Sequence, residues 1–231
     1  MEVRELRIPV EARHVETVRA VLRRPEAPRE SAVLLAHGAG FHLDSPWMAA
    51  VAEGLARRDF TVLAFNYPYR EHALEVGKNR PPDRAPVLEA AHERALEALR
   101  EAAPGQRLLL AGKSLGGRMS THLAAKDVPC AGLVLFGYPL HPPRKPERLR
   151  DEHFAAIVQP ALFLQGTRDT LCDLDLLGTS LRRWGGTATV DVIDDADHGF
   201  HVRRSSGTSD EEVLERLLDR VARWDDETFP V

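Results

Sequence analysis

Five short runs of uninterrupted apolar residues place the strongest constraint on how this 231-residue chain can fold. They read VLLAHG, TVLAFN, RLLLAG, GLVLFG and ALFLQG, and they begin at Val33, Thr61, Arg107, Gly132 and Ala161. Runs that are apolar throughout, rather than alternating, are typical of strands that are buried on both faces. Longer segments with helical spacing separate the runs, so we expect a mostly parallel sheet with helices on both faces.

The same patterns predict eight strands and five helices along the chain. The strands are expected at 3–9, 15–22, 32–37, 60–66, 107–111, 132–137, 161–165 and 187–193, with the first two forming an antiparallel pair. The helices are expected at 46–58, 84–102, 115–126, 173–183 and 209–225. The last helix has the clearest start, because Ser209 and Glu212 have the spacing of a capping box. Two segments broken by proline, 67–83 and 138–153, are predicted to be loops.

Length and composition indicate one globular domain spanning residues 1–231. Hydrophobic residues make up 43% of the chain and charged residues 29%, which is ordinary for a folded domain. The net charge of −4 gives no support for a nucleic acid or an anionic membrane as partner. The N-terminus has no apolar targeting region, and no apolar run approaches the roughly 20 residues that span a bilayer. We therefore expect a cytoplasmic protein without a membrane partner; its oligomeric state is left open.

The stretch LLLAGKSLGG at 108–117 can be interpreted in two ways. Gly-Lys-Ser is how a phosphate-binding loop of the G-x-x-x-x-G-K-[ST] type ends. Such a loop would need glycine at position 107, which is Arg107, and the next four residues are apolar. The stretch therefore does not have the pattern of a nucleotide site.

Read instead as G-x-S-x-G, the stretch presents Ser114 on a turn between a strand and a helix. A serine hydroxyl is a weak nucleophile until a histidine accepts its proton and an acid orients that histidine. In chain order, Asp169 follows the strand at 161–165 and His198 follows the strand at 187–193. Asp173 and Asp175 are alternatives to Asp169 but suit the start of the next helix better. His201 is the alternative to His198 and is expected to be exposed.

A serine nucleophile also needs two backbone N–H groups for the oxyanion that forms during acyl transfer. The N–H of Leu115 is one candidate, because it follows Ser114 at the start of a helix. The glycine-rich loop HGAG at 37–40 provides the other, with Ala39 as the candidate and Gly40 as the near alternative.

Taken together, HGAG, GKSLGGR, GTRD and DADHGF resemble the motifs of the α/β-hydrolase superfamily in order and spacing. The segment 137–169 resembles a small branch of dienelactone-hydrolase-like proteins, which includes a testis-expressed protein and a subunit of a histone-acetylating complex. The resemblance covers about residues 30–225. It implies Ser114 as nucleophile, Asp169 as acid, His198 as base, and Leu115 and Ala39 as oxyanion donors.

The expected fold is thus a single α/β-hydrolase domain without a large cap, since the segment 138–156 is too short to form one. The site should be open, with Gly40, Lys113, Tyr138 and His141 as possible substrate-lining residues. Lys113 is expected either to reach the pocket rim, where its charge would favour anionic acyl groups, or to point to solvent.

The expected activity is hydrolysis of a small carboxylic ester or thioester through an acyl-enzyme, without a metal or an organic cofactor. Two alternatives stay open. The fold could serve only as an interaction scaffold, or the same three residues could transfer the acyl group to peroxide or an amine.

Overall fold

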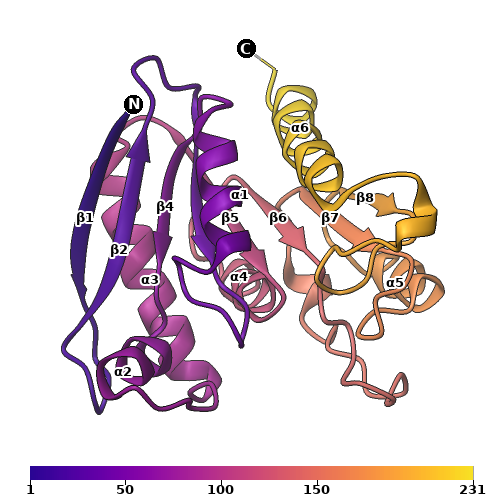
Figure 1. Ribbon diagram of the computed structural model, residues 1–231, viewed down its shortest axis with the longest axis horizontal. Coiled ribbons are helices and arrows are strands. Elements are labelled where there is room, and N and C mark those ends of the chain that lie inside the picture. The colour runs from indigo at the N-terminus through magenta and orange to yellow at the C-terminus, as the bar shows by residue number, and fades with distance from the viewer. Residues whose placement is uncertain (231) are drawn as a thin grey trace.

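The computed structural model describes residues 1–230, and its centre is one eight-stranded sheet (Figure 1). The strand order is β1-β2-β4-β3-β5-β6-β7-β8. The strands are β1 (Glu2–Pro9), β2 (Thr17–Arg24), β3 (Ser31–Ala36), β4 (Thr61–Phe65), β5 (Arg107–Lys113), β6 (Gly132–Phe136), β7 (Ala161–Gly166) and β8 (Ala188–Ile193). β2 pairs antiparallel with β1 and β4, and every other pair is parallel. All eight predicted strands are confirmed.

Helices cover both faces of the sheet. They are α1 (Pro46–Ala56), α2 (Pro68–Val76), α3 (Ala85–Ala102), α4 (Leu115–Ala124), α5 (Leu174–Leu181) and α6 (Asp210–Thr228). α1 and α6 pack on one face, while α3, α4 and α5 pack on the other. This two-sided cover explains why every residue of β3, β4, β6 and β7 is buried.

The prediction of a loop at 67–83 is wrong, because α2 lies within it. Pro68 occupies the first helical position, where the missing N–H would have no partner within the helix anyway. The helix ends at Gly77, whose φ of 64° terminates it in the left-handed conformation. The paired prolines 81 and 82 lie beyond this stop, so they end the segment without preventing the helix.

The carboxyl ends of the parallel strands lie along one edge of the sheet, which brings their loops together. Register places Ala36 opposite Gly112, and Lys113 opposite Phe136. Between β6 and β7 the only helical element within the described chain is one short 3₁₀ turn, Phe154–Ala156. The loops at this edge are therefore not covered by a separate cap.

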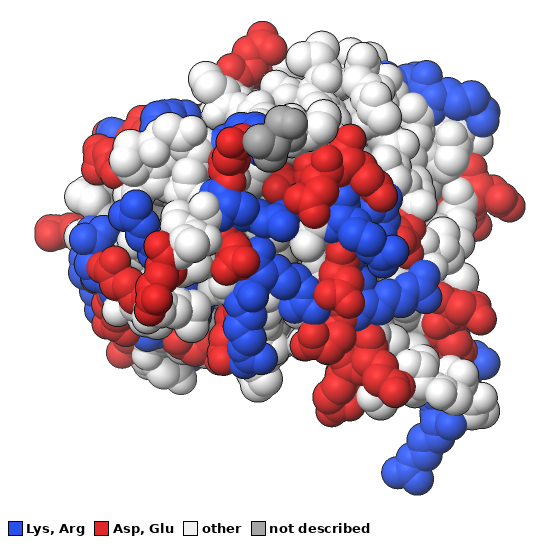
Figure 2. Space-filling view, turned by 90° about the horizontal axis from the view of Figure 1, so that it is seen from above, with Lys and Arg blue, Asp and Glu red and all other residues white. Residues whose placement is uncertain are grey.

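Charges of both signs are mixed over the face seen in Figure 2. The ion pairs of Arg58 with Glu215 and Asp219, which join the end of α1 to α6, are typical of this mixing. Within residues 1–230, no helix combines the length and the apolar character needed to cross a membrane.

Candidate active site

Ser114 lies on a strained turn between β5 and α4. Its φ of 52° and ψ of −108° are unusual for a residue with a side chain, and its N–H donates to the carbonyl of Phe136 at 3.0 Å. A Cβ on Gly112 would lie 2.3 Å from the backbone of Gly116, and a Cβ on Gly116 would lie 2.3 Å from the carbonyl oxygen of Ala36. Both glycines of G-x-S-x-G are thus required by the close approach of α4 to β3 and β5.

The structure brings Ser114, His198 and Asp169 together in one hydrogen-bonded chain. His198 Nε2 lies 2.9 Å from Ser114 Oγ, and His198 Nδ1 lies 2.7 Å from Asp169 Oδ2. The Asp169 side chain is only 1% exposed, whereas His198 is 28% exposed and open to the surface. With the carboxylate accepting from Nδ1–H, the free electron pair of Nε2 faces the serine hydroxyl. This is the geometry that proton transfer from Ser114 to His198 requires.

Gln165 supports the carboxylate and was missed by the sequence-based prediction. Its Nε2 donates to Asp169 Oδ2, and its Oε1 accepts from the N–H of Tyr138 at 2.9 Å. The other carboxylate oxygen, Oδ1, accepts from the N–H of Leu171 at 2.8 Å. Gln165 is fully buried, and its signal in the sequence was a single amide at the end of the apolar run ALFLQG.

The alternative candidates for the acid and the base have structural roles or lie away from Ser114. Asp173 caps α5 by accepting from the N–H of Leu176 at 2.9 Å, and Asp175 lies in the first turn of that helix. His201 is exposed and its Nδ1 lies 2.7 Å from Asp210. Neither aspartate contacts His198, and His201 does not contact Ser114.

His37 anchors the glycine-rich loop after β3. Its Nε2 accepts from the N–H of Tyr67 at 3.0 Å, so its Nδ1 carries the proton and donates to the carbonyl of Gly38 at 2.8 Å. Complete burial lowers the pKa of His37 to about 4, and the ring is neutral at ordinary pH. His37 therefore positions the loop.

Side chains of α2 donate hydrogen bonds to the carbonyl groups of the loop residues that follow Gly38. Tyr69 donates to the carbonyl of Ala39 at 2.9 Å, and Arg70 donates to the carbonyls of Gly40 and Phe41. Within residues 1–230, the N–H groups of Ala39 and Gly40 donate to no protein group, and the same is true of Leu115 at the start of α4. These donors are thus available to a ligand.

Lys113 lies neither at the pocket rim nor in solvent, so both of its predicted positions are wrong. It is 2% exposed, its Nζ donates to the backbone carbonyl of His198, and Nζ lies 4.9 Å from the Phe200 ring centroid and 5.7 Å from that of Trp47. β5 continues to residue 113, and strand alternation turns this side chain into the same layer as Leu109, beneath α1 and α6. Burial lowers the pKa of Lys113 to about 8.

A family model described as an alpha/beta hydrolase domain matches residues 29–226 of the chain. The protein belongs to the α/β-hydrolase family. Solved structures of similar shape include an alpha-beta serine hydrolase homologue from Coxiella burnetii, with a TM-score of 0.73 and 17% identity over 95% of this chain and 96% of that one. A dienelactone hydrolase from Anabaena variabilis gives a TM-score of 0.71 and 19% identity over 98% and 99% of the two chains. A serine hydrolase without a lid from Xanthomonas campestris gives 0.71 and 19% over 96% and 95%. At these identities the likeness shows the fold.

In this α/β-hydrolase the other predicted lining residues have different surroundings. Gly40 is exposed in the glycine-rich loop. Tyr138 is fully buried, and its hydroxyl donates to the carbonyl of Arg150 at 2.7 Å, so its prediction as a lining residue is wrong. Its ring packs in the core beside Phe163, because the chain turns inward after β6. His141 is almost buried and accepts from the N–H of Asp173, but it reaches a shallow surface groove beside Asp169.

A second groove of the hydrolase, termed the aromatic groove, is lined in part by Gly199, which directly follows His198. It has a volume of about 460 Å³ and lies between the start of α1, the loop after His198 and the first turns of α6. Its apolar lining consists mainly of Phe41, Pro46, Trp47, Ala50, Phe200 and Leu214.

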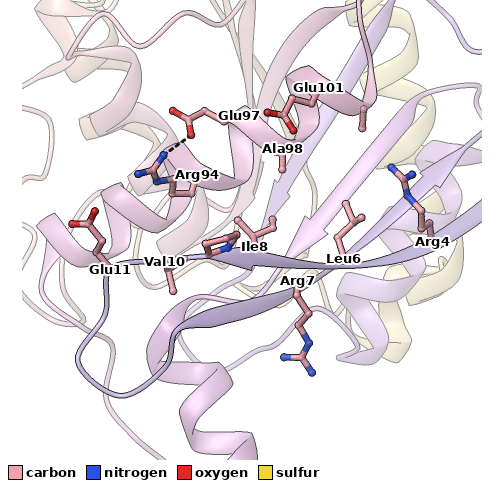
Figure 3. A pocket seen from close by; sticks show the side chains of 12 residues that line it. Arg4, Leu6, Arg7, Ile8, Val10, Glu11, Arg94, Glu97, Ala98 and Glu101 are labelled. Atoms are coloured by element: carbon pink, nitrogen blue, oxygen red, sulfur yellow. Dashed lines mark hydrogen bonds and ion pairs between the residues drawn. The ribbon is translucent and has the colours of Figure 1, made fainter.

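A further groove lies between β1 and α3, away from Ser114 (Figure 3). Half of its twelve lining residues are charged, and Arg94 and Glu97 pair within it at 3.0 Å. Three strands, β2, β4 and β3, separate β1 from β5, so this groove is not part of the site around Ser114. Within residues 1–230, no group of three or more His, Cys, Asp or Glu side chains is placed to hold a metal ion.

Proposed function

We propose that this α/β-hydrolase cleaves carboxylic esters or thioesters through an acyl-enzyme formed on Ser114. The observation that carries the proposal is the hydrogen-bonded chain from Ser114 Oγ through His198 to the buried carboxylate of Asp169. A strained serine at the end of a buried strand has little structural use, and it presents its hydroxyl to ligands.

In the proposed reaction, Ser114 Oγ attacks the carbonyl carbon while its proton passes to His198 Nε2. Asp169 stabilises the imidazolium through Nδ1–H, and the oxyanion accepts hydrogen bonds from the N–H groups of Leu115 and of Ala39 or Gly40. The leaving alcohol or thiol takes the proton from His198. Water then attacks the carbonyl carbon of the acyl-enzyme and gives a proton to His198, which returns it to Ser114 Oγ as the carboxylic acid leaves. None of these steps requires a metal or an organic cofactor.

The similar structures support this assignment, since one is a dienelactone hydrolase and others are serine hydrolases or esterases. On the residues of segment 137–169, we also propose membership of the small branch with the testis-expressed protein and the histone-acetylating-complex subunit. The small-molecule acyl substrate and the cytoplasmic location stay predictions.

The test is hydrolysis of p-nitrophenyl esters and acyl thioesters by wild-type protein and three variants. Ser114→Ala and His198→Ala should each lower kcat by a factor on the order of 10⁶, and Asp169→Ala by about 10⁴, because the three groups act as a unit. Ser205→Ala, in an exposed turn, is the matched control. A loss below about tenfold in Ser114→Ala would contradict the proposal.

Labelling with a fluorophosphonate probe separates the enzyme from a scaffold of the same fold. An adduct on Ser114, absent from Ser114→Ala, supports the enzyme, whereas folded protein without an adduct supports the scaffold. Product analysis with added peroxide or amine shows whether water is the preferred acceptor.

A further inference from the structure

Two residues that line the aromatic groove directly follow parts of the proposed active site. Gly199, which lines it, directly follows His198, and Phe41 directly follows the glycine-rich loop. The Trp47 and Phe200 rings stack with their centroids 6.0 Å apart and their planes 8° apart. The volume of about 460 Å³ falls within the roughly 300–1,000 Å³ that is usual for small-molecule sites.

The charged groups that line the groove are His201, Asp210 and Glu211. His201 Nδ1 lies 2.7 Å from Asp210 Oδ2, and this contact raises the pKa of His201 and lowers that of Asp210. When His201 is protonated, its positive charge is balanced by the negative charge of Asp210, and Glu211 adds a further negative charge. The rim therefore has no surplus cation for an anionic ligand.

The nearest ammonium group is also unavailable to a ligand in the groove. Lys113 Nζ lies close to the Phe200 and Trp47 rings, is almost completely buried and donates to the carbonyl of His198. The two rings line the groove, whereas Lys113 does not, so its ammonium group is not exposed to a ligand there.

We propose that the aromatic groove binds an uncharged hydrocarbon group of the ester substrate. The inference rests on the proposed function and adds the substrate class: neutral esters with a hydrocarbon chain or ring, rather than anionic acyl groups. The group can be bonded to the carbonyl carbon or to the alcohol oxygen, and the two arms of the test distinguish these sources.

One arm measures kcat/KM for p-nitrophenyl esters from acetate to octanoate, and the other for acetate esters of straight-chain alcohols of increasing length. In the arm whose group enters the groove, kcat/KM should rise about threefold to fourfold per methylene until the groove is filled. The kcat/KM for p-nitrophenyl hexanoate should also exceed that for the p-nitrophenyl half-ester of adipate, which has a terminal carboxylate.

Ala50→Phe fills the groove from α1 and should lower the ratio of long-chain to acetate kcat/KM at least about tenfold. Ala49→Phe is the matched control, because Ala49 is on the same helix and equally half-buried but does not line the groove. This control should keep the wild-type ratio. If Ala50→Phe fails to fold, the smaller Ala50→Val should shift the ratio in the same direction.

An unchanged ratio in a folded Ala50 variant, or faster cleavage of the adipate half-ester, would overturn the groove assignment. Ser114-dependent ester hydrolysis with a kcat/KM that does not change with chain length in either arm would also overturn the groove assignment. The proposed function would stand in that case. If no ester is cleaved in a Ser114-dependent way, the proposed function fails and this inference fails with it.

Discussion

The Lys113 side chain connects the strand of the nucleophile to the loop that holds His198. Its Nζ donates to the His198 carbonyl. The same Nζ lies close to Gly137, and a Cβ at position 137 would be 2.8 Å from it. Gly137 has a φ of 62°, so a side chain at this position would be strained as well as crowded. The ammonium group therefore fills the space between the ends of β5 and β6 and the His198 loop.

We expect Lys113 to be a positioning residue for His198. Lys113→Met keeps the length and the apolar stem but removes the hydrogen bond, so the imidazole should lose its fixed distance from Ser114. Small displacements of reacting groups are costly, and kcat should fall by about tenfold to a hundredfold with a smaller change in KM. Steady-state kinetics and the fluorophosphonate labelling rate measure this effect. Lys78→Met, on an exposed turn, should match wild type, and an unchanged kcat in folded Lys113→Met would refute the role.

The same burial should make the free energy of unfolding depend on pH. The pKa of Lys113 falls from its ordinary value of 10.5 to about 8, because burial outweighs the charges of Asp169 and Asp197. Below about pH 8, Lys113 is protonated in both the folded and the unfolded state, and its buried charge destabilises the folded state. Between the two pKa values the unfolded chain keeps a proton that the folded chain has released, so the contribution of Lys113 to stability rises with pH.

Urea unfolding of wild type and Lys113→Met at several pH values measures this dependence. The free energy of unfolding of wild type, relative to the variant, should increase by about 2 kcal/mol from about pH 7.5 to about pH 10. Wild type compared with Lys78→Met should show no such increase. A constant difference between wild type and Lys113→Met would show that the ammonium is not disfavoured by burial.

At the scale of elements, α6 starts with a complete capping box next to the aromatic groove. Ser209 Oγ accepts from the N–H of Glu212 at 3.2 Å, and Glu212 Oε2 accepts from the N–H of Ser209 at 2.8 Å. The first two turns carry Asp210 and Leu214, which line the groove. The cap therefore fixes the start of a helix that forms one wall of that groove.

Ser209→Ala removes one half of this box and should lower the free energy of unfolding by about 1 kcal/mol. For a domain of this size that corresponds to a melting temperature about 2–4 °C lower. Calorimetry measures the shift, and Ser205→Ala serves as control in the preceding exposed turn. Equal melting temperatures for the two variants would show that the cap does not stabilise α6.

At the scale of the whole molecule, a buried polar cluster ties the C-terminal helix to the sheet. Asp225 on α6 accepts from Ser31 Oγ at 2.6 Å and from Arg29 at 3.1 Å, at the start of β3. Burial raises the pKa of Asp225 even though both partners favour its charged form. These contacts join residues nearly 200 positions apart, so they hold α6 against the sheet.

Asp225→Ala should lower the free energy of unfolding by about 2 kcal/mol, because it leaves the buried Ser31 hydroxyl and the Arg29 guanidinium without this partner. Asp226→Ala is a close control, since Asp226 also contacts Arg29 but its side chain is 67% exposed. Its loss should be below about 1 kcal/mol. Urea unfolding of both variants compares them, and equal losses would contradict a dominant role for the buried carboxylate.

The strands, most helices and the residues around Ser114 could be predicted from sequence because their signals are local. A continuous apolar run can only be stable when covered on both faces, and this places β3 to β7 in the interior. The spacing of glycines around Ser114 indicates a tight turn, and the positions of Asp169 and His198 after later strands put them at the same edge of a parallel sheet. α2 was missed because its prolines suggested a loop, although one of them is a favourable first residue of a helix.

The surroundings of side chains at the strand ends could not be predicted from local sequence patterns. Lys113 points into the α1 and α6 layer because β5 is two residues longer than its apolar run suggests, and each added strand residue changes the face of the sheet. Gln165 and Tyr138 join the support of Asp169 through contacts between β6 and β7 that no local pattern specifies. The aromatic groove forms from two regions distant in sequence, residues 41–50 and 199–214. Local sequence patterns thus specify which catalytic groups the chain can present, while packing specifies which groups surround them, because strand order and loop contacts depend on the whole core.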